Sequence, residues 1–430
     1  MRTPPLRTGR AAGPALALSL ALTLAAVAGC VAPAPQGPAG DTSMPAVAPG
    51  VTADGIKVGI TYPDLEAVRQ FVQIDHGDYV AAYDAVIARI NAQGGINGRL
   101  IVPVYAKINP VGPAPAQEAC ARLAQDEKVF AALGFFNSDD PLCYVETQRT
   151  AVFGGAFTEA GGARAKAPWF STAGGDGITA AVAKFAEQGE LLKGRKIAVV
   201  GSVLAPKDVE KAKSALTQAG SAPVETATLD AAPNDTVAVA QQSAVIVERF
   251  RAAGADTVFA IGPISTSIGT QIEKTPWRPR FLFPDLGSGA LYAADQAPHD
   301  WSVLAGATAA GIRSDFQDPE YLACLEDLYR ADPSRRGTVL APEAKPQGSP
   351  DLYTSVLTAC QNIALFRAVA AKAGTKLDYR TLKAAGDSLG AFHVPGVAGT
   401  AEYSAASPYG KRQLSIAHYD PTTRRFTVAP

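Results

Sequence analysis

Short apolar runs alternate with amphipathic stretches along most of the chain, and this alternation constrains the fold more than any other feature. The runs include "IKVGIT", "LIVPVYA", "VFAALGF", "KIAVVGS" and "DTVFAIG". Between the first two runs, apolar side chains recur at helical spacing, at Val80, Tyr83, Val86, Ile87 and Ile90. Strands that are apolar throughout are typical of parallel sheets covered by helices on both faces. The sequence therefore predicts an α/β fold.

The alternation forms two series, and residues 51–430 are too many for one ordinary core. We therefore expect two doubly wound lobes. The glycine-rich "STAGGDG" between the series suits a crossing or hinge. The expected bounds are 51–173 plus about 310–395 for lobe 1, and 174–309 plus about 396–430 for lobe 2. The C-terminal tail alternates like an antiparallel hairpin that turns at Asp420-Pro421.

Residues 1–29 have the layout of a secretory signal peptide. Three arginines and no acidic residue precede an apolar run that ends at Cys30. The stretch Val27-Ala28-Gly29-Cys30 resembles a bacterial lipobox, which implies cleavage before Cys30 and attachment of lipid to its thiol. A plain transmembrane anchor is the alternative, but the run is short for a span and contains Pro14.

The segment after Cys30 reads as a tether between a lipid anchor and a folded domain. Residues 31–50 hold five prolines and no basic residue. Without residues 1–29, the chain keeps 36 of its 39 basic residues and all 40 acidic ones, a net charge of −4. No basic run or surplus indicates nucleic-acid binding.

Four cysteines remain besides Cys30, and an even number outside the cytosol fits two disulfides. We expect the pairs Cys120–Cys143 and Cys324–Cys360, each joining neighbouring helical segments. Buried free thiols are the alternative.

The sequence contains no pattern typical of an active site. Its four histidines, at 76, 299, 393 and 418, are not at metal-ligand spacing from one another. Neither a phosphate loop in the right context nor a G-x-S-x-G motif occurs. We therefore expect no catalytic residues, no metal and no cofactor.

The stretch "RINAQGGINGRLIVPVYA" at 89–106 changes from helical to strand character within a few residues. Gly94 or Gly95 can adopt the left-handed conformation that ends a helix. Asn97-Gly98 can then form a tight turn into the next strand.

With these elements in place, the chain resembles the type I periplasmic binding proteins, and within them the branched-chain amino acid-binding group of ABC transporters. The stretches that carry the resemblance are "VTADGIKVGI", "INAQGGINGRLIVPVYA", "EACARLAQDEKVFAALG", "KIAVVGS" and "GADTVFAIG". It implies two α/β lobes joined by a three-stranded hinge, a solute clamped between them, and delivery to an ABC permease.

The resemblance also implies solute-binding positions at strand ends, where open parallel sheets bind ligands. Family members bind a solute carboxylate after the third and fourth strands, which correspond here to Ser138, Ala156 and Thr158. An acidic residue after a second-lobe strand takes the solute ammonium, and Asp285 occupies that place. Ser138 and Asp285 can instead serve as helix caps or turn residues.

Two aromatic residues at these strand ends depart from the family pattern. Tyr62 follows the first strand, and Phe136 lies where small residues are common. Either side chain can line a pocket for a larger or aromatic solute, or simply pack in the core.

From these features we expect a monomeric, extracytoplasmic solute-binding lipoprotein of an ABC importer, anchored to the bacterial membrane, with no enzymatic activity. Its partners would be a small solute, such as an amino acid, and the permease. A sensing or scaffolding receptor of the same fold is the first alternative, and a hydrolase with its site between the lobes is the second.

Overall fold

The computed structural model describes residues 48–69, 74–137, 139–172, 177–202, 206–232, 235–262, 267–295, 297–346 and 349–428. Cys30 and Ser138 lie outside these residues, as do most of "STAGGDG" and the segments after β6 (Ile197–Ser202) and β8 (Thr257–Ala260).

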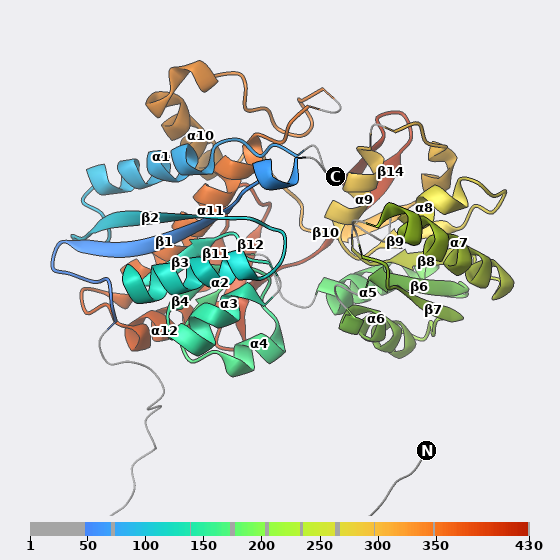
Figure 1. Cartoon of the computed structure of the whole chain (residues 1–430), viewed down its shortest axis with the longest axis horizontal. Helices are drawn as coiled ribbons and strands as arrows, with labels where there is room; N and C mark the ends of the chain where they lie inside the picture. Colours follow the sequence, from blue (N-terminus) through green and yellow to red (C-terminus); the bar gives the residue numbers. More distant parts are fainter. Residues whose placement is uncertain are drawn as a thin grey trace, which may run out of the picture. The chain divides into compact units, whose positions relative to one another are not determined.

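The first sheet has five parallel strands in the order β2-β1-β3-β4-β5 (Figure 1). They are β1 (Gly55–Pro63), β2 (Leu100–Ile108), β3 (Ala131–Gly134), β4 (Ala151–Gly154) and β5 (Trp169–Phe170). Apolar side chains cover both faces of this sheet. Ile56, Val58 and Ile60 belong to one core, and Ala132 and Val152 belong to the other. Burial on both faces explains why these strands have no polar alternation.

Helices from both ends of the sequence cover the first sheet. On one face lie α1 (Tyr79–Ala92), α10 (Pro319–Ala331), α11 (Tyr353–Ala373) and α12 (Tyr379–Asp387). The other face is covered by α2 (Ala114–Ala121) and α3 (Asp140–Leu142), and each of these two helices continues into a π-helical turn. The short helix α4 (Glu159–Arg164) follows β4. This lobe thus combines segments that lie more than 200 residues apart in the sequence.

The second sheet has the order β15-β14-β10-β9-β8-β6-β7. Five strands are parallel: β6, β7 (Glu225–Leu229), β8, β9 (Arg280–Phe283) and β10 (Thr308–Gly311). The hairpin of β14 (Ser415–Asp420) and β15 (Arg425–Val428) adds to β10 antiparallel, which confirms the hairpin predicted for the tail.

Successive β6 side chains enter different cores of the second lobe, as expected for a sheet buried on both faces. Ala198 and Val200 pack toward α7 (Thr236–Ala252), α8 (Ser267–Ile272) and α9 (Leu286–Ala293). Ile197 and Val199 pack toward α5 (Gly177–Glu187) and α6 (Pro206–Gln218). The predicted α/β class with two doubly wound parallel-sheet lobes is therefore confirmed.

A small antiparallel sheet of β11 (Gly390–His393), β12 (Thr400–Ser404) and β13 (Ser407–Lys411) lies beside the end of β5. The Tyr403 hydroxyl donates to the Ser171 carbonyl at 2.8 Å, and the Ser171 N–H donates to the Pro408 carbonyl at 3.1 Å. The chain passes between the two large sheets three times: after β5, after β10 and after β13. We call the second and third passages, residues 312–318 and 412–414, the second and third crossings.

Two local predictions agree with the structure. The chain forms the disulfides Cys120–Cys143 and Cys324–Cys360. After α1, the Gly95 N–H donates to the Ile90 carbonyl at 2.9 Å, and Gly94 and Gly95 both have positive φ angles. A Cβ on Gly95 would lie 1.9 Å from the Arg99 carbonyl oxygen, so this turn requires glycine.

Candidate functional site

The carboxyl ends of β3 and β4 lie level with each other and with Thr61 of β1, which continues for two more residues to Pro63. Thr61 pairs with Gly134, and Gly134 pairs with Gly154, across the three neighbouring strands. Gly134 has a φ of +115°, and a Cβ there would lie 2.2 Å from the Thr61 carbonyl oxygen. The Thr61 hydroxyl donates to the Phe135 carbonyl at 2.7 Å and so fixes the start of the loop after β3. The loops after β3 and β4 therefore begin together beside β1, at the edge at which parallel sheets bind ligands.

Two of the predicted carboxylate-binding residues of the first lobe lie at this edge. Ala156 is exposed two residues after β4, and Thr158 is the exposed N-cap of α4. The Thr158 hydroxyl accepts a hydrogen bond from the Gly161 N–H at 3.0 Å. The third predicted residue, Ser138, lies outside the described residues.

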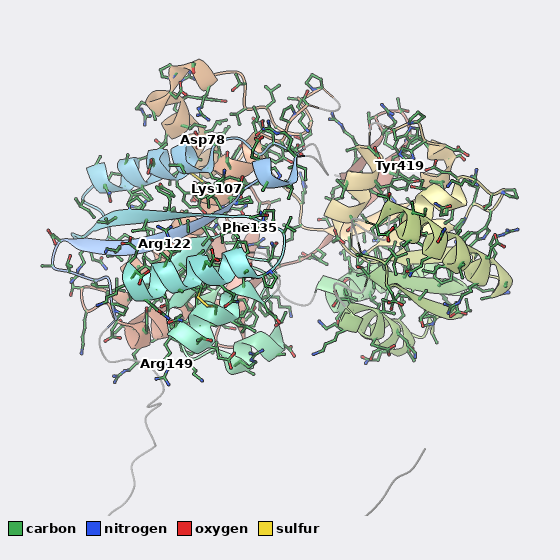
Figure 2. The ribbon with its side chains drawn as sticks, in the orientation of Figure 1. Asp78, Lys107, Arg122, Phe135, Arg149 and Tyr419 are labelled. Atoms are coloured by element: carbon green, nitrogen blue, oxygen red, sulfur yellow. A yellow bond between two sulfur atoms is a disulfide. The ribbon has the colours of Figure 1, made fainter. Side chains whose placement is uncertain are left out.

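The two aromatic residues that depart from the family pattern make packing contacts. The Phe136 side chain is only 8% exposed, and its ring meets that of Tyr144 edge-on at 5.6 Å. Tyr62 is half-buried, 6.2 Å from the Tyr79 ring and 6.4 Å from the Tyr105 ring. Figure 2 labels Phe135, which is half-buried directly after β3. Contact of Tyr62 or Phe136 with a solute stays a prediction.

An aromatic group at the end of β4 was not predicted. The half-buried Phe157 ring lies 4.8 Å from Trp169 and 5.6 Å from Tyr409. The Trp169 indole N–H donates to the Gly154 carbonyl at 2.9 Å, which holds this group against the strand end. The position of Phe157 between Ala156 and Thr158 was a usable signal, but Tyr409 is 252 residues further along the chain and no local pattern marks it.

Asp285 begins α9 after the second-lobe strand β9. Its side chain is exposed at the N-cap and accepts hydrogen bonds from the Ser288 N–H at 2.7 Å and the Ser288 hydroxyl at 2.8 Å. Both carboxylate oxygens thus have partners, and each retains a second lone pair for a ligand donor. The carboxylate is held rigidly at a strand end, as a predicted ammonium-binding group requires.

The loop after β3 has an unusual carboxyl group at the start of α3. Burial raises the pKa of Asp140, the N–H of Asn137 counteracts this by donating at 2.9 Å, and the charge of Asp139 raises the pKa further. Asp140 therefore carries its charge less readily than a solvated aspartate does.

Among the described residues, no three His, Cys, Asp or Glu side chains are grouped so that they would hold a metal ion. The same residues include no helix whose length and apolar character would let it cross a membrane.

A cavity of about 720 Å³ lies away from these strand ends, at the second and third crossings. Arg313, Arg412 and Ile416 are among its lining residues, and none of the five predicted solute-binding residues that the structure describes lines it. This cavity is therefore not at the expected solute site.

Comparisons with known proteins agree with this architecture. A type 1 periplasmic binding protein from Bordetella pertussis Tohama I superposes with a TM-score of 0.63 at 17% identity, over 88% of this chain and 100% of that one. An ABC transporter substrate-binding protein from Desulfitobacterium hafniense in complex with Leu gives 0.60 at 13% identity, over 87% and 100%. A solute-binding protein from R. palustris in complex with 4-hydroxybenzoate gives 0.61 at 16% identity, over 87% and 96%.

A search of curated proteins found no match to the sequence. The model of the periplasmic binding protein family matches residues 55–276, which is more than half of the chain. These residues contain the first sheet and most of the parallel strands of the second. The chain therefore belongs to the periplasmic binding protein family.

Proposed function

We propose that the protein is an extracytoplasmic, lipid-anchored solute-binding protein of an ABC importer, and that it binds an amino acid or a related small polar solute. One observation carries the proposal: the ends of β3 and β4 lie level beside Thr61 of β1, with Ala156 and Thr158 exposed beside them. The exposed Asp285 carboxylate stands at the corresponding end of β9 in the second lobe.

The proposed recognition divides the two charges of an amino acid between the lobes. The Thr158 hydroxyl and nearby backbone N–H groups would bind the solute carboxylate, as helix N-termini do. Asp285 would bind the ammonium by a charge-assisted hydrogen bond. Of the similar structures, one is a complex with leucine and another with 4-hydroxybenzoate, and both of those molecules carry a carboxyl group.

The proposed solute class is tested by thermal unfolding of the purified protein with amino acids, their amides and aromatic acids. A ligand that binds the folded state raises the unfolding temperature, and at equal concentration a tighter ligand raises it more. Calorimetry on each hit, with recovery of unchanged ligand, separates binding from hydrolysis. If no carboxylate-bearing solute in the panel binds, the proposed class is wrong.

The proposed anchor depends on Cys30. The Cys30→Ser variant of the full chain should lose incorporation of labelled fatty acid and leave the membrane fraction. An unchanged membrane fraction would instead support an uncleaved membrane span. Loss of solute import in cells that lack this protein would distinguish transport from sensing.

A further inference from the structure

The cavity at the crossings is assembled from five separate parts of the chain. Lys184 and Gln188 come from α5 and the residue after it, and Arg313 comes from the second crossing. The third crossing contributes Arg412, and residues 398–400 contribute the loop that leads into β12. Strands β14 and β15 of the second sheet complete the lining, so segments associated with both lobes face one cavity of about 720 Å³.

The lining is cationic. Lys184, Arg313 and Arg412 line the cavity, and no aspartate or glutamate does. Lys184 forms an ion pair of 2.7 Å with Glu187, whose own side chain is 60% exposed. Within the described part of the chain, the Arg313 guanidinium has no hydrogen bond or ion pair; only its backbone carbonyl accepts, from the Ala398 N–H at 2.9 Å. The positive charge of this cavity is therefore only partly compensated by the protein.

Arg412 is half-buried, whereas Arg313 is exposed to solvent. The Nε and Nη2 atoms of Arg412 are covered by protein and have no hydrogen-bond partner. Burial lowers the pKa of Arg412, and the neighbouring Tyr403 phenol opposes this only in part. Buried donors without acceptors destabilise a fold, and a buried charge without a counter-charge does so more strongly. Such an arrangement is explained most simply by an acceptor that is not part of the chain.

The two unpartnered nitrogens also define the shape of that acceptor. Nε–H and Nη2–H lie on the same edge of a guanidinium and point in nearly the same direction. This edge matches two oxygens of a carboxylate or of an inorganic oxyanion. Because both nitrogens are covered by protein, the Arg412 side chain must turn toward the cavity before an anion can reach them. The half-buried Arg335 shows the contrast, because it pairs with Asp332 at 2.8 Å and Asp78 at 3.0 Å.

We propose that this cavity is a second binding site, which takes a small carboxylate or oxyanion through Arg412, Arg313 and Lys184. The anion binds beside the second and third crossings and contacts residues associated with both lobes. Its volume lies within the usual range for small-ligand pockets. The site does not depend on the proposed solute site, because it shares no residue with it.

The test measures binding of sulfate and, separately, acetate to the purified protein by calorimetry, with ionic strength held constant by sodium chloride. A site gives a saturable binding isotherm, whereas general salt effects on the protein do not saturate. Saturation by acetate assigns a carboxylate, and saturation by sulfate alone assigns an inorganic oxyanion. If neither anion gives a saturable isotherm, the proposal is wrong.

Variants locate the site. The double variant Arg313→Gln/Arg412→Met should lose at least about tenfold in affinity for the saturating anion. Arg251→Gln removes a charge from the surface of α7, where Arg251 pairs with Glu248 at 2.7 Å, and should bind the anion as the wild type does. Equal loss in both variants would show a general charge effect and overturn the assignment.

Arg412→Met alone provides a second readout. In buffer without sulfate or acetate, this variant should unfold at a temperature equal to or above that of the wild type, because it removes unpartnered buried donors. A clearly lower temperature would show that Arg412 has acceptors within the protein and would overturn the proposal. Solute affinity, measured by calorimetry on the same variants, should not change, so failure of this site and failure of the proposed solute site are distinguishable.

Discussion

The Nε2 atom of His393 lies 2.8 Å from Oδ1 of Asp318, and this pair joins the end of β11 to the start of α10. Asp318 is 4% exposed, and its other oxygen accepts from the Gly396 N–H at 2.8 Å and the Tyr321 N–H at 3.1 Å. The pair therefore fixes the second crossing to the loop after β11, next to the cationic cavity.

We predict that this pair makes stability depend on pH. Burial alone would lower the pKa of His393, but the hydrogen bond and charge of Asp318 outweigh it and raise the pKa above its usual value. A raised histidine pKa contributes stability that is complete below the unfolded value, about 6.5, and is lost as pH rises through the folded value. Because the side chain is 35% exposed, we expect less than about 1 kcal/mol.

Urea unfolding of the wild type and His393→Gln between pH 6 and pH 9 tests this, with pH values chosen on both sides of about 6.5. The stability difference between the two proteins should shrink as pH rises. Asp318 has the opposite pH dependence. Burial raises its pKa, but the Gly396 N–H, His393 and the Tyr321 N–H together lower it below its usual value. The stability that Asp318 contributes is therefore lost as pH falls through the pKa of the folded state. A difference that does not vary with pH would contradict the prediction.

A second prediction separates the two roles of Asp285. Asn is as good an N-cap as Asp, so Asp285→Asn should keep α9 and change stability by less than about 0.5 kcal/mol. It removes the charge that is proposed to bind an ammonium, so affinity for an amino acid should fall at least about tenfold. Calorimetry with a confirmed solute measures this.

Asp235→Asn is the matched control for Asp285. Asp235 caps α7 in the same way, by accepting from the Ala238 N–H at 2.9 Å, and it has no proposed solute contact. Unchanged solute affinity in Asp285→Asn would show that Asp285 is a cap and nothing more.

A third prediction concerns the disulfides. Cys324–Cys360 joins α10 to α11 across a sequence separation of 36, and Cys120–Cys143 closes a shorter loop of separation 23. Loop-closure entropy predicts a loss of about 3–4 kcal/mol for each bond, slightly more for the longer loop. Thermal unfolding of the two double-Ala variants, with and without reductant, measures both losses. If reductant does not lower the unfolding temperature of the wild type, the two disulfides are not present in the purified protein.

The sequence predicted the elements whose causes are local. The apolar runs correctly predicted the parallel strands, and the glycines of "QGGINGR" correctly predicted the turn after α1. Both depend on periodicity and backbone conformation, which are properties of neighbouring residues. The disulfide pairs were also predicted, since each joins neighbouring helical segments.

Features that depend on distant contacts were not predictable in the same way. The contact of Phe157 with Tyr409, and the burial of Arg412 beside Tyr403, arise only when the C-terminal strands pack beside the first sheet. The small sheet of β11, β12 and β13 is another such case. The predicted lobe boundary at about 396 falls between β11 and β12, which pair directly with each other, from Gly390–Tyr403 to His393–Thr400.

A fourth prediction tests the close approach of strands at the candidate site. Gly134→Ala would place a Cβ 2.2 Å from the Thr61 carbonyl oxygen, at a φ of +115°. Gly220→Ala is the matched control, because Gly220 has a φ of +77° and no atom within 4 Å of an added Cβ. The control should lose about 1–2 kcal/mol through backbone strain alone.

Gly134→Ala should lose clearly more than the control, because β1 and β3 must also move apart. Urea denaturation of both variants gives the comparison. The same displacement disturbs the level ends of β3 and β4 beside Thr61, so solute affinity should fall in Gly134→Ala and stay unchanged in Gly220→Ala. Equal stability losses, or an unchanged affinity in Gly134→Ala, would show that the spacing of these strand ends does not shape the solute site.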